Sequence, residues 1–231
     1  QAAEGRHRRH RPPHAAGRKP RRGRGPFAPG AQVRLTRASS RLHRLRNGPR
    51  GDEQLTEADE PGQGFLAETC RAWEAEALRA ESFGVRVVRL RIGLVLGPGG
   101  GALSKMVTPF QWFVGGPLGS GRQWVSWIHQ DDVLGLIEWA LSSVPIRGVV
   151  NATAPTPVTM REFCRCLGEA LHRPSWVPVP AVALRLLLGE MADLLLTGQR
   201  VIPHVALQRN YPFRYPALLP ALQACLSRRV A

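Results

Sequence analysis

The chain has 231 residues, a length that allows one domain with a sizeable core and a small appendage. Its net charge of +15 is unevenly placed: residues 1–50 hold 15 Arg and Lys against one acid, whereas residues 51–231 hold 17 against 16. The folded part is therefore nearly neutral, and the high overall charge says nothing about its partners. Four cysteines without metal-ligand or redox spacing predict no metal site and indicate free thiols in a reducing cytoplasm.

No targeting or membrane segment is expected. The N-terminus is charged and lacks the apolar stretch of a signal peptide. The longest apolar run, residues 177–196, is interrupted by Arg185, Glu190 and Asp193, which argues against a spanning helix. We therefore predict a cytoplasmic protein without a membrane partner.

Residues 1–50 consist mainly of Arg, Pro, Gly, Ala and His and show no apolar periodicity. Such a segment cannot offset its ordering entropy by burial, so a disordered arm is expected. Three interpretations are open: a nucleic-acid-binding tail, a plain solvated arm, and a segment translated from a wrong frame or start, which we favour. Phe27 is the single aromatic residue of residues 1–50, so stacking on nucleic-acid bases lacks support. If nucleic acid is a partner at all, only the arm is expected to contact it.

The folded pattern starts near Gly51 with an acidic, turn-rich loop, followed by a predicted helix over residues 65–82 that ends at Gly84. Its apolar stripe has helical spacing and comprises Leu66, Cys70, Trp73 and Ala77. Residues 85–104 then read as a buried strand that empties into a glycine-rich loop. Open α/β sheets place their binding loops at such strand ends.

The remaining pattern alternates helices and short strands. The predicted elements are a helix at 103–110, a strand before His129, a helix at 132–142, a strand at 147–150, and helices at 160–171, 181–196 and 216–226. Asp131 is the expected N-cap of the helix at 132–142, and Thr159 with Glu162 forms a capping box for the helix at 160–171. Pro220 fits poorly inside the last helix.

This order predicts an α/β fold, the C-terminal half of a Rossmann-like doubly wound parallel sheet with a small helical C-terminal extension. A strand followed by a glycine fingerprint is absent from the sequence, so the usual phosphate-binding half is missing. The expected divisions are an arm at 1–50, the α/β part at 51–178 and the helical extension at 179–231.

Several motifs resemble a known family. RIGLVLGPGG and SWIHQDDV resemble the strand–loop and the F-V-H-V-D-D-V segment of extended short-chain dehydrogenase/reductases. GFLAETCRAWEAEA, GGPLGSGRQWVSWIH and the tail from VPVPAVALRLLLGE to GQRVIP resemble one subfamily, the NAD(P)-dependent epimerase/dehydratase-like "epimerase family" proteins. The resemblance runs from about Gly51 to Leu226.

The resemblance implies an NADP- or NAD-dependent epimerase, dehydratase or reductase acting on a small-molecule substrate. Family members begin with a glycine-rich strand–loop, so the resemblance also implies that this chain is a fragment, inactive by itself. A non-enzymatic binding protein whose arm contacts nucleic acid is the alternative. Short-chain dehydrogenases use a Tyr–Lys pair four residues apart. By the resemblance these positions are Leu66 and Cys70, so the pair is absent and enzymatic activity stays open.

The resemblance places the nicotinamide side of the cofactor site at Ile92, Gly93, Leu94 and Val95. Candidate substrate-binding residues are Lys105, Arg122, Trp127 and His129, and no catalytic residue is assigned. Packing is the alternative role for Trp127 and Trp124, and a buried, loop-orienting role is the alternative for His129. Arg122 stands near the diphosphate-binding Arg of sugar-nucleotide enzymes, whose position here is Val125. Oligomeric state and the choice between NADP and NAD stay open.

Overall fold

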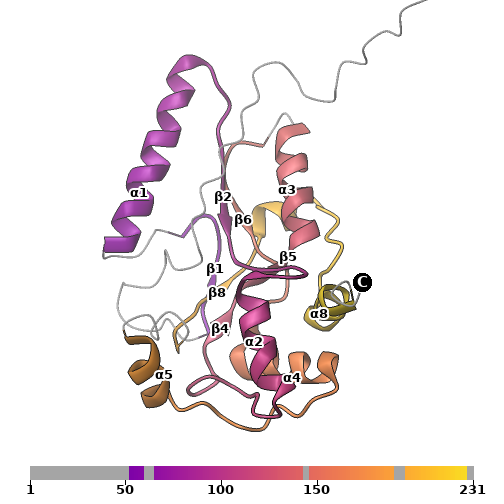
Figure 1. The fold of residues 1–231 in the computed structure, drawn as a ribbon. Helices are drawn as coiled ribbons and strands as arrows, with labels where there is room; N and C mark the ends of the chain where they lie inside the picture. Colours follow the sequence, from indigo (N-terminus) through magenta and orange to yellow (C-terminus); the bar gives the residue numbers. More distant parts are fainter. Residues whose placement is uncertain (1–51, 60–64, 143–145, 190–195, 228–231) are drawn as a thin grey trace, which may run out of the picture.

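A computed structural model of the chain describes residues 52–59, 65–142, 146–189 and 196–227 (Figure 1). The predicted disorder of residues 1–50 lies outside these ranges. The strands are β1 Gln54–Leu55, β2 Val88–Ile92, β3 Leu94–Leu96, β4 Trp124–Val125, β5 Trp127–His129, β6 Gly148–Ala152, β7 Val158–Thr159 and β8 Arg200–Val201. The helices are α1 Phe65–Leu78, the 3₁₀ helix η2 Arg79–Phe83, α2 Gly101–Gln111, α3 Gln130–Ser142, α4 Met160–Leu171, α5 Ala181–Leu188, α7 His204–Gln208 and α8 Leu218–Ser227.

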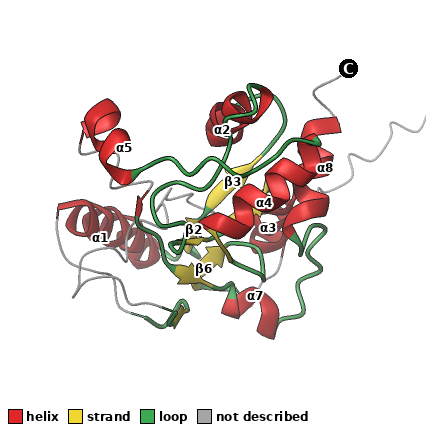
Figure 2. Ribbon diagram, turned by 90° about the horizontal axis from the view of Figure 1, so that it is seen from below, coloured by secondary structure: helices red, strands yellow, loops and turns green. Residues whose placement is uncertain are grey.

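The predicted central strand is β2 and β3, which follow one another with a single break at Gly93. β2 pairs in parallel with β6, from Val88 opposite Gly148 to Ile92 opposite Ala152. β3 pairs in parallel with β5. Two short pairings complete the strands: β4 with β7, antiparallel, and β1 with β8, parallel. In the view from below, β2, β3 and β6 lie centrally with helices around them (Figure 2). The predicted parallel α/β architecture is confirmed.

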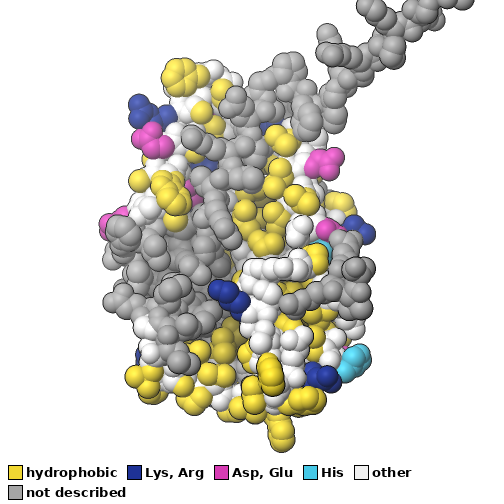
Figure 3. All heavy atoms as spheres, viewed as in Figure 1, with side chains coloured by type: hydrophobic (Ala, Val, Ile, Leu, Met, Phe, Trp, Pro, Cys, Tyr) yellow, Lys and Arg dark blue, Asp and Glu magenta, His cyan; other side chains and the backbone are white. Residues whose placement is uncertain are grey.

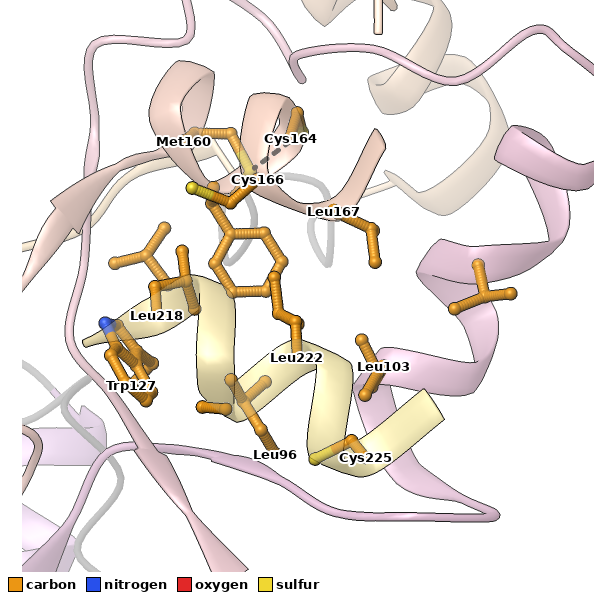
Figure 4. Close-up of a cluster of buried hydrophobic side chains, with 14 of the residues drawn as sticks. Leu96, Leu103, Trp127, Met160, Cys164, Cys166, Leu167, Leu218, Leu222 and Cys225 are labelled. Atoms are coloured by element: carbon orange, nitrogen blue, oxygen red, sulfur yellow. Dashed lines mark hydrogen bonds between the residues drawn. The ribbon is translucent and has the colours of Figure 1, made fainter. Parts of the chain in front are cut away.

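The largest core lies between β3, β5 and the helices α2, α4 and α8 (Figure 4). Phe163 and Leu167 of α4 are fully buried, and α8 contributes Leu222 and Cys225 to the same cluster. A helix of the C-terminal extension therefore packs into the same core as the sheet. A second cluster joins β2 and β6 to α3.

Strand β2 has two unlike faces. Val88 and Leu90 point into the apolar cluster with α3, whereas Arg89 and Arg91 point toward α1. The carboxylate of Glu74 on α1 accepts hydrogen bonds from Arg89 Nη1 at 2.9 Å and from Arg91 Nε at 2.9 Å. The apolar stripe predicted for α1 is therefore partly wrong. Trp73 is 55% exposed, and the neighbouring Glu74 is buried in its place.

Most predicted helix ends are confirmed. Gly84 closes η2 with φ 75°, and α4 has the predicted bounds, with Thr159 Oγ1 accepting the Glu162 N–H at 3.3 Å. The predicted 181–196 helix is interrupted, because α5 ends at Leu188 and Gly189 follows with φ 56°, whereas Leu196 at the end of the prediction is helical. Residues 190–195 of that prediction lie outside the described residues. Pro220 is accommodated because it lies in the first turn of α8, where backbone N–H groups have no acceptor within the helix.

Candidate functional site

The central strand changes partner at Gly93. The Gly93 N–H donates to the carbonyl of Ala152 in β6 at 3.0 Å, and the next N–H, of Leu94, donates to the carbonyl of Ser126 beside β5 at 2.8 Å. A Cβ atom at position 93 would overlap the Ser126 carbonyl oxygen, so only glycine fits. The predicted nicotinamide-side residues are all half-buried around this crossover and are Ile92, Gly93, Leu94 and Val95. Their contact with a cofactor stays a prediction.

The predicted glycine-rich loop follows this strand. Residues 97–100 connect β3 to α2, which begins at Gly101 with φ 68°. A shallow hollow lies between the loop and the end of α8. It is lined by Gly97, Gly99, Gly100, Leu103, Ser104, Cys225 and Leu226. The loop thus lies at the carboxyl end of a parallel strand, where α/β sheets place ligands.

Residues 199–202, here called the strap, cross beside Asn151, near the carboxyl end of β6, and beside Ser126, which lies between β4 and β5. Ser126 Oγ donates to the Gln199 carbonyl at 2.7 Å and accepts the Val201 N–H at 2.9 Å. The Asn151 side-chain amide donates to the Ile202 carbonyl at 3.0 Å. Because these hydrogen bonds use backbone atoms of the strap, no side-chain pattern in residues 199–202 predicts where the strap lies.

A polar corner lies beside the strap. The Arg200 guanidinium stacks over the Trp124 ring at 4.7 Å, and the Trp124 indole N–H donates to the Asp52 carboxylate at 3.0 Å. Glu57 Oε1 accepts the Asn151 N–H at 2.8 Å, while Glu57 Oε2 is buried without a hydrogen-bond partner. The residues named here and the strap bring three separate chain segments together. No local sequence pattern indicated a site role for Asp52, Glu57 or Arg200, and Asp52 and Arg200 are 148 residues apart in the chain.

His129 ends β5 and caps the helix that follows. Its Nδ1 accepts the backbone N–H of Asp131 at 3.1 Å, and its ring lies 3.9 Å from that of Tyr215. The predicted capping role of Asp131 is wrong, because α3 already begins at Gln130 and the residue before it, His129, makes the cap. The His129 side chain is 1% exposed, which supports the buried, loop-orienting alternative for this residue.

The other predicted substrate residues are not brought together. Trp127 is fully buried, and its indole N–H donates to the Thr156 carbonyl at 3.0 Å, so the side chain packs in the core, which favours the packing alternative. Lys105 on α2 and Arg122 on the loop before β4 are both exposed. Their substrate contacts remain predictions. Val125, the position of the diphosphate-binding Arg by resemblance, is buried in β4.

Tyr211 does not replace the missing Tyr–Lys pair. The Tyr211 hydroxyl donates to the Asp132 carbonyl at 3.4 Å, and burial raises the pKa of Tyr211 to about 12. A tyrosine that exchanges a proton with substrate needs a lowered pKa, so this shift has the wrong direction. Burial, with the Glu74 carboxylate, also raises the pKa of the Cys70 thiol. Within the described ranges, no group of three or more His, Cys, Asp or Glu side chains is placed to hold a metal ion.

The parallel β2–β3 strand, its glycine loop and the crossover helices define the C-terminal part of a Rossmann-like domain of the short-chain dehydrogenase/reductase class. A crystal structure of the human epimerase family protein SDR39U1 with NADPH superposes with a TM-score of 0.77 at 34% identity, covering 88% of this chain and 68% of that one. The chain belongs to the epimerase family.

Curated sequences agree with this membership. The chloroplastic SDR39U1 homologue of Arabidopsis thaliana is 52% identical over 165 residues, which cover 71% of this chain and 47% of the plant protein. YfhF of Bacillus subtilis is 41% identical, with 71% of this chain and 54% of YfhF covered. The chain thus spans about half the length of the curated relatives it matches. Residues 179–225 match a domain of unknown function, DUF1731.

Proposed function

We propose that this chain forms the nicotinamide-side wall and helical extension of an NADP- or NAD-dependent epimerase or reductase. The observation that carries the proposal is the β2–β3 strand, which passes Gly93 between β6 and β5 and leads into the glycine loop. The human relative was solved with NADPH, which supports this class of cofactor. When bound, a nicotinamide supplies hydride transfer. Residues Ile92 to Val95 would lie along the nicotinamide side.

The strap and the polar corner would lie on the substrate side of the cofactor site. Arg200, which lies over the Trp124 ring, and the buried Glu57 carboxylate are two polar groups there that have a buried atom without a hydrogen-bond partner. The substrate is proposed to be a small molecule. The cytoplasmic location stays a prediction; among the described helices none is long and apolar enough to cross a membrane.

We further propose that the 231 residues bind cofactor only weakly by themselves, because the sequence contains no glycine fingerprint for the pyrophosphate. Titration of the full chain with NADPH, followed by NADPH fluorescence, tests this. The expected result is a dissociation constant far above the micromolar range. Micromolar or tighter binding would show that phosphate recognition is supplied in some other way.

The alternative is a binding protein whose arm contacts nucleic acid, favoured by the 15 Arg and Lys among residues 1–50. A mobility-shift comparison of the full chain with one that starts at Gly51 separates the two functions. Salt-sensitive binding that disappears with the arm would support the alternative. Absence of any shift at low salt would remove it.

A further inference from the structure

One end of the molecule carries a group of exposed apolar side chains, here called the aromatic ridge (Figure 3). It comprises Trp112, Phe113, Val114, Trp176, Val177, Val182 and Leu186. Trp112 is 75% exposed and Trp176 74% exposed, far more than a monomer's packing requires of an indole. A surface this apolar, spread over several elements, indicates a contact with something outside the fold.

The ridge is one surface, although its residues come from distant parts of the sequence. The Val177 N–H donates to the Gly115 carbonyl at 3.3 Å, and the Val179 N–H donates to the Pro117 carbonyl at 3.0 Å. These bonds hold the segment after α2 beside the segment before α5. Helix α5 then starts at Ala181 and presents Val182 and Leu186 as its exposed apolar positions.

The backbone holds one ridge residue outward at a cost. Phe113 has φ 60°, a left-handed conformation that a bulky side chain rarely adopts. Its ring is 53% exposed, and the Arg173 guanidinium lies over it at 4.6 Å. Strain of this kind persists where the surrounding structure over-determines it, and it gathers at functional positions.

The chain segments that contain the ridge carry a net positive charge. Residues 101–123 and 158–189, which build it, contain six Arg and Lys and two acids. Both acids, Glu162 and Glu169, are already bonded to Arg165 at 2.8 and 2.9 Å. Lys105 is an exposed residue of α2, seven residues before Trp112, which is the residue that ends this helix. The charge around the exposed aromatic side chains is therefore complementary to an anionic surface.

We propose that the aromatic ridge docks on the surface of an anionic phospholipid bilayer. Indole and phenyl rings favour the headgroup region, and Arg and Lys beside them meet lipid phosphates. Arg173 is the cation that lies at the ridge, over the Phe113 ring, and Lys105 and Arg122 are further exposed cations of the same chain segments. The charged residues within the apolar run 177–196 argue against a spanning helix, and the expectation of no membrane partner followed from that; a contact with the membrane surface needs no spanning helix.

The first experiment measures flotation of the full chain with phosphatidylcholine vesicles that contain about 30 mol% phosphatidylglycerol, against phosphatidylcholine alone. The variant W112S/W176S is expected to lower the partition coefficient about tenfold or more, since each lost ring removes apolar contact. R122Q/R173Q is expected to lower it about fivefold for each charge removed. W73S is the matched control, because Trp73 is also exposed but lies on α1.

The Arg-rich residues 1–50 could attach to anionic vesicles by charge, so a second readout reports insertion. Residues 1–50 contain no tryptophan, and quenching of tryptophan fluorescence by brominated lipids therefore reports only on the folded part. The conservative variant W112F/W176F should retain binding but lose most of the quenching. It also keeps the test valid if the serine variant folds poorly.

Three outcomes would overturn the proposal. The first is no binding to the anionic vesicles. The second is binding that W112S/W176S leaves unchanged and that brominated lipids do not quench, which would assign it to the arm. The third is a dimer, seen by sedimentation without vesicles, that W112S/W176S converts to a monomer, because the ridge would then be a contact between two copies.

Discussion

Asp132 fastens the C-terminal extension to the α/β part. Its carboxylate is 2% exposed and accepts the backbone N–H groups of Arg214 at 2.7 Å and Tyr215 at 3.0 Å. Tyr215 in turn packs on His129, which caps α3, the helix whose first turn contains Asp132. One buried side chain therefore sets the path of the chain into α8.

Asp132→Asn should lower the free energy of unfolding by about 2–3 kcal/mol, because an amide cannot accept both N–H groups as strongly and hydrogen bonds to charged acceptors are the stronger kind. Urea unfolding of the variant and the parent measures it. Asp131→Asn is the matched control; its partner Arg214 is 65% exposed, so the effect should stay below about 1 kcal/mol. Equal effects at the two positions would contradict the role given to Asp132.

Glu74 neutralises charge between α1 and β2. Its side chain is 7% exposed and meets two arginines, while Arg89 Nε and Arg91 Nη1 are buried without hydrogen-bond partners. Glu74→Gln leaves both guanidinium groups uncompensated and should cost about 3–5 kcal/mol of unfolding free energy. Glu76→Gln removes the exposed ion pair between Glu76 and Arg79 and should change the unfolding free energy by less than about 0.5 kcal/mol. A small effect at Glu74 would mean that water reaches the pair.

At the scale of single elements, α4 gives a prediction for pH. The hydrogen bond from Arg165 holds the pKa of the Glu162 carboxyl below its usual value of 4.5. A lowered folded-state pKa contributes stability that is present above the unfolded pKa and is lost as the pH falls through the folded pKa. The parent should therefore lose more stability than Glu162→Gln when the pH falls from 6 to about 3. Thermal unfolding across that range tests it, and identical pH dependence would contradict the pairing.

The crossover in the central strand gives a second prediction at this scale. Gly93→Ala places a methyl group on the Ser126 carbonyl oxygen, which is backbone and cannot rotate away, so we expect a loss of about 2 kcal/mol or more. Gly100→Ala is the control, because φ is −170° and nothing lies within 4 Å of its Cβ position. Denaturant midpoints of the two variants should differ clearly; a tolerated alanine at 93 would mean that β2 and β3 can separate.

These elements also show how far sequence reasoning reaches. The first and last residues of α4 follow from a local capping pair and a regular apolar period, so both ends of this helix were predictable. The burial of Glu74 was not, since its arginines lie 15 and 17 residues away and any apolar pattern prefers Trp73. The strap was not predictable either, because it is held by backbone atoms about 50 to 75 residues from Ser126 and Asn151.

At the scale of the whole molecule, the sequence division at residue 178 does not coincide with a division of the core. Leu218 and Leu222 of α8 share one apolar cluster with Phe163 of α4 and Leu96 of β3. Apolar area removed from water contributes about 25 cal/mol per Å², so elements that bury one another gain stability together. We therefore expect residues 179–227 to unfold together with the α/β part.

Thiol labelling under native conditions tests that expectation. Cys164, Cys166 and Cys225 lie in the shared core, and burial raises the pKa of Cys164 to about 12 and that of Cys166 to about 11. Cys70 on α1 is half-buried and outside that core, so it should react first with a thiol reagent. The other three should react slowly, with rates that rise in parallel as urea is added, because each exposure requires the same opening. Labelling of Cys225 at lower urea than Cys164 would show instead that α8 opens separately from the sheet, and that the extension is a unit of its own.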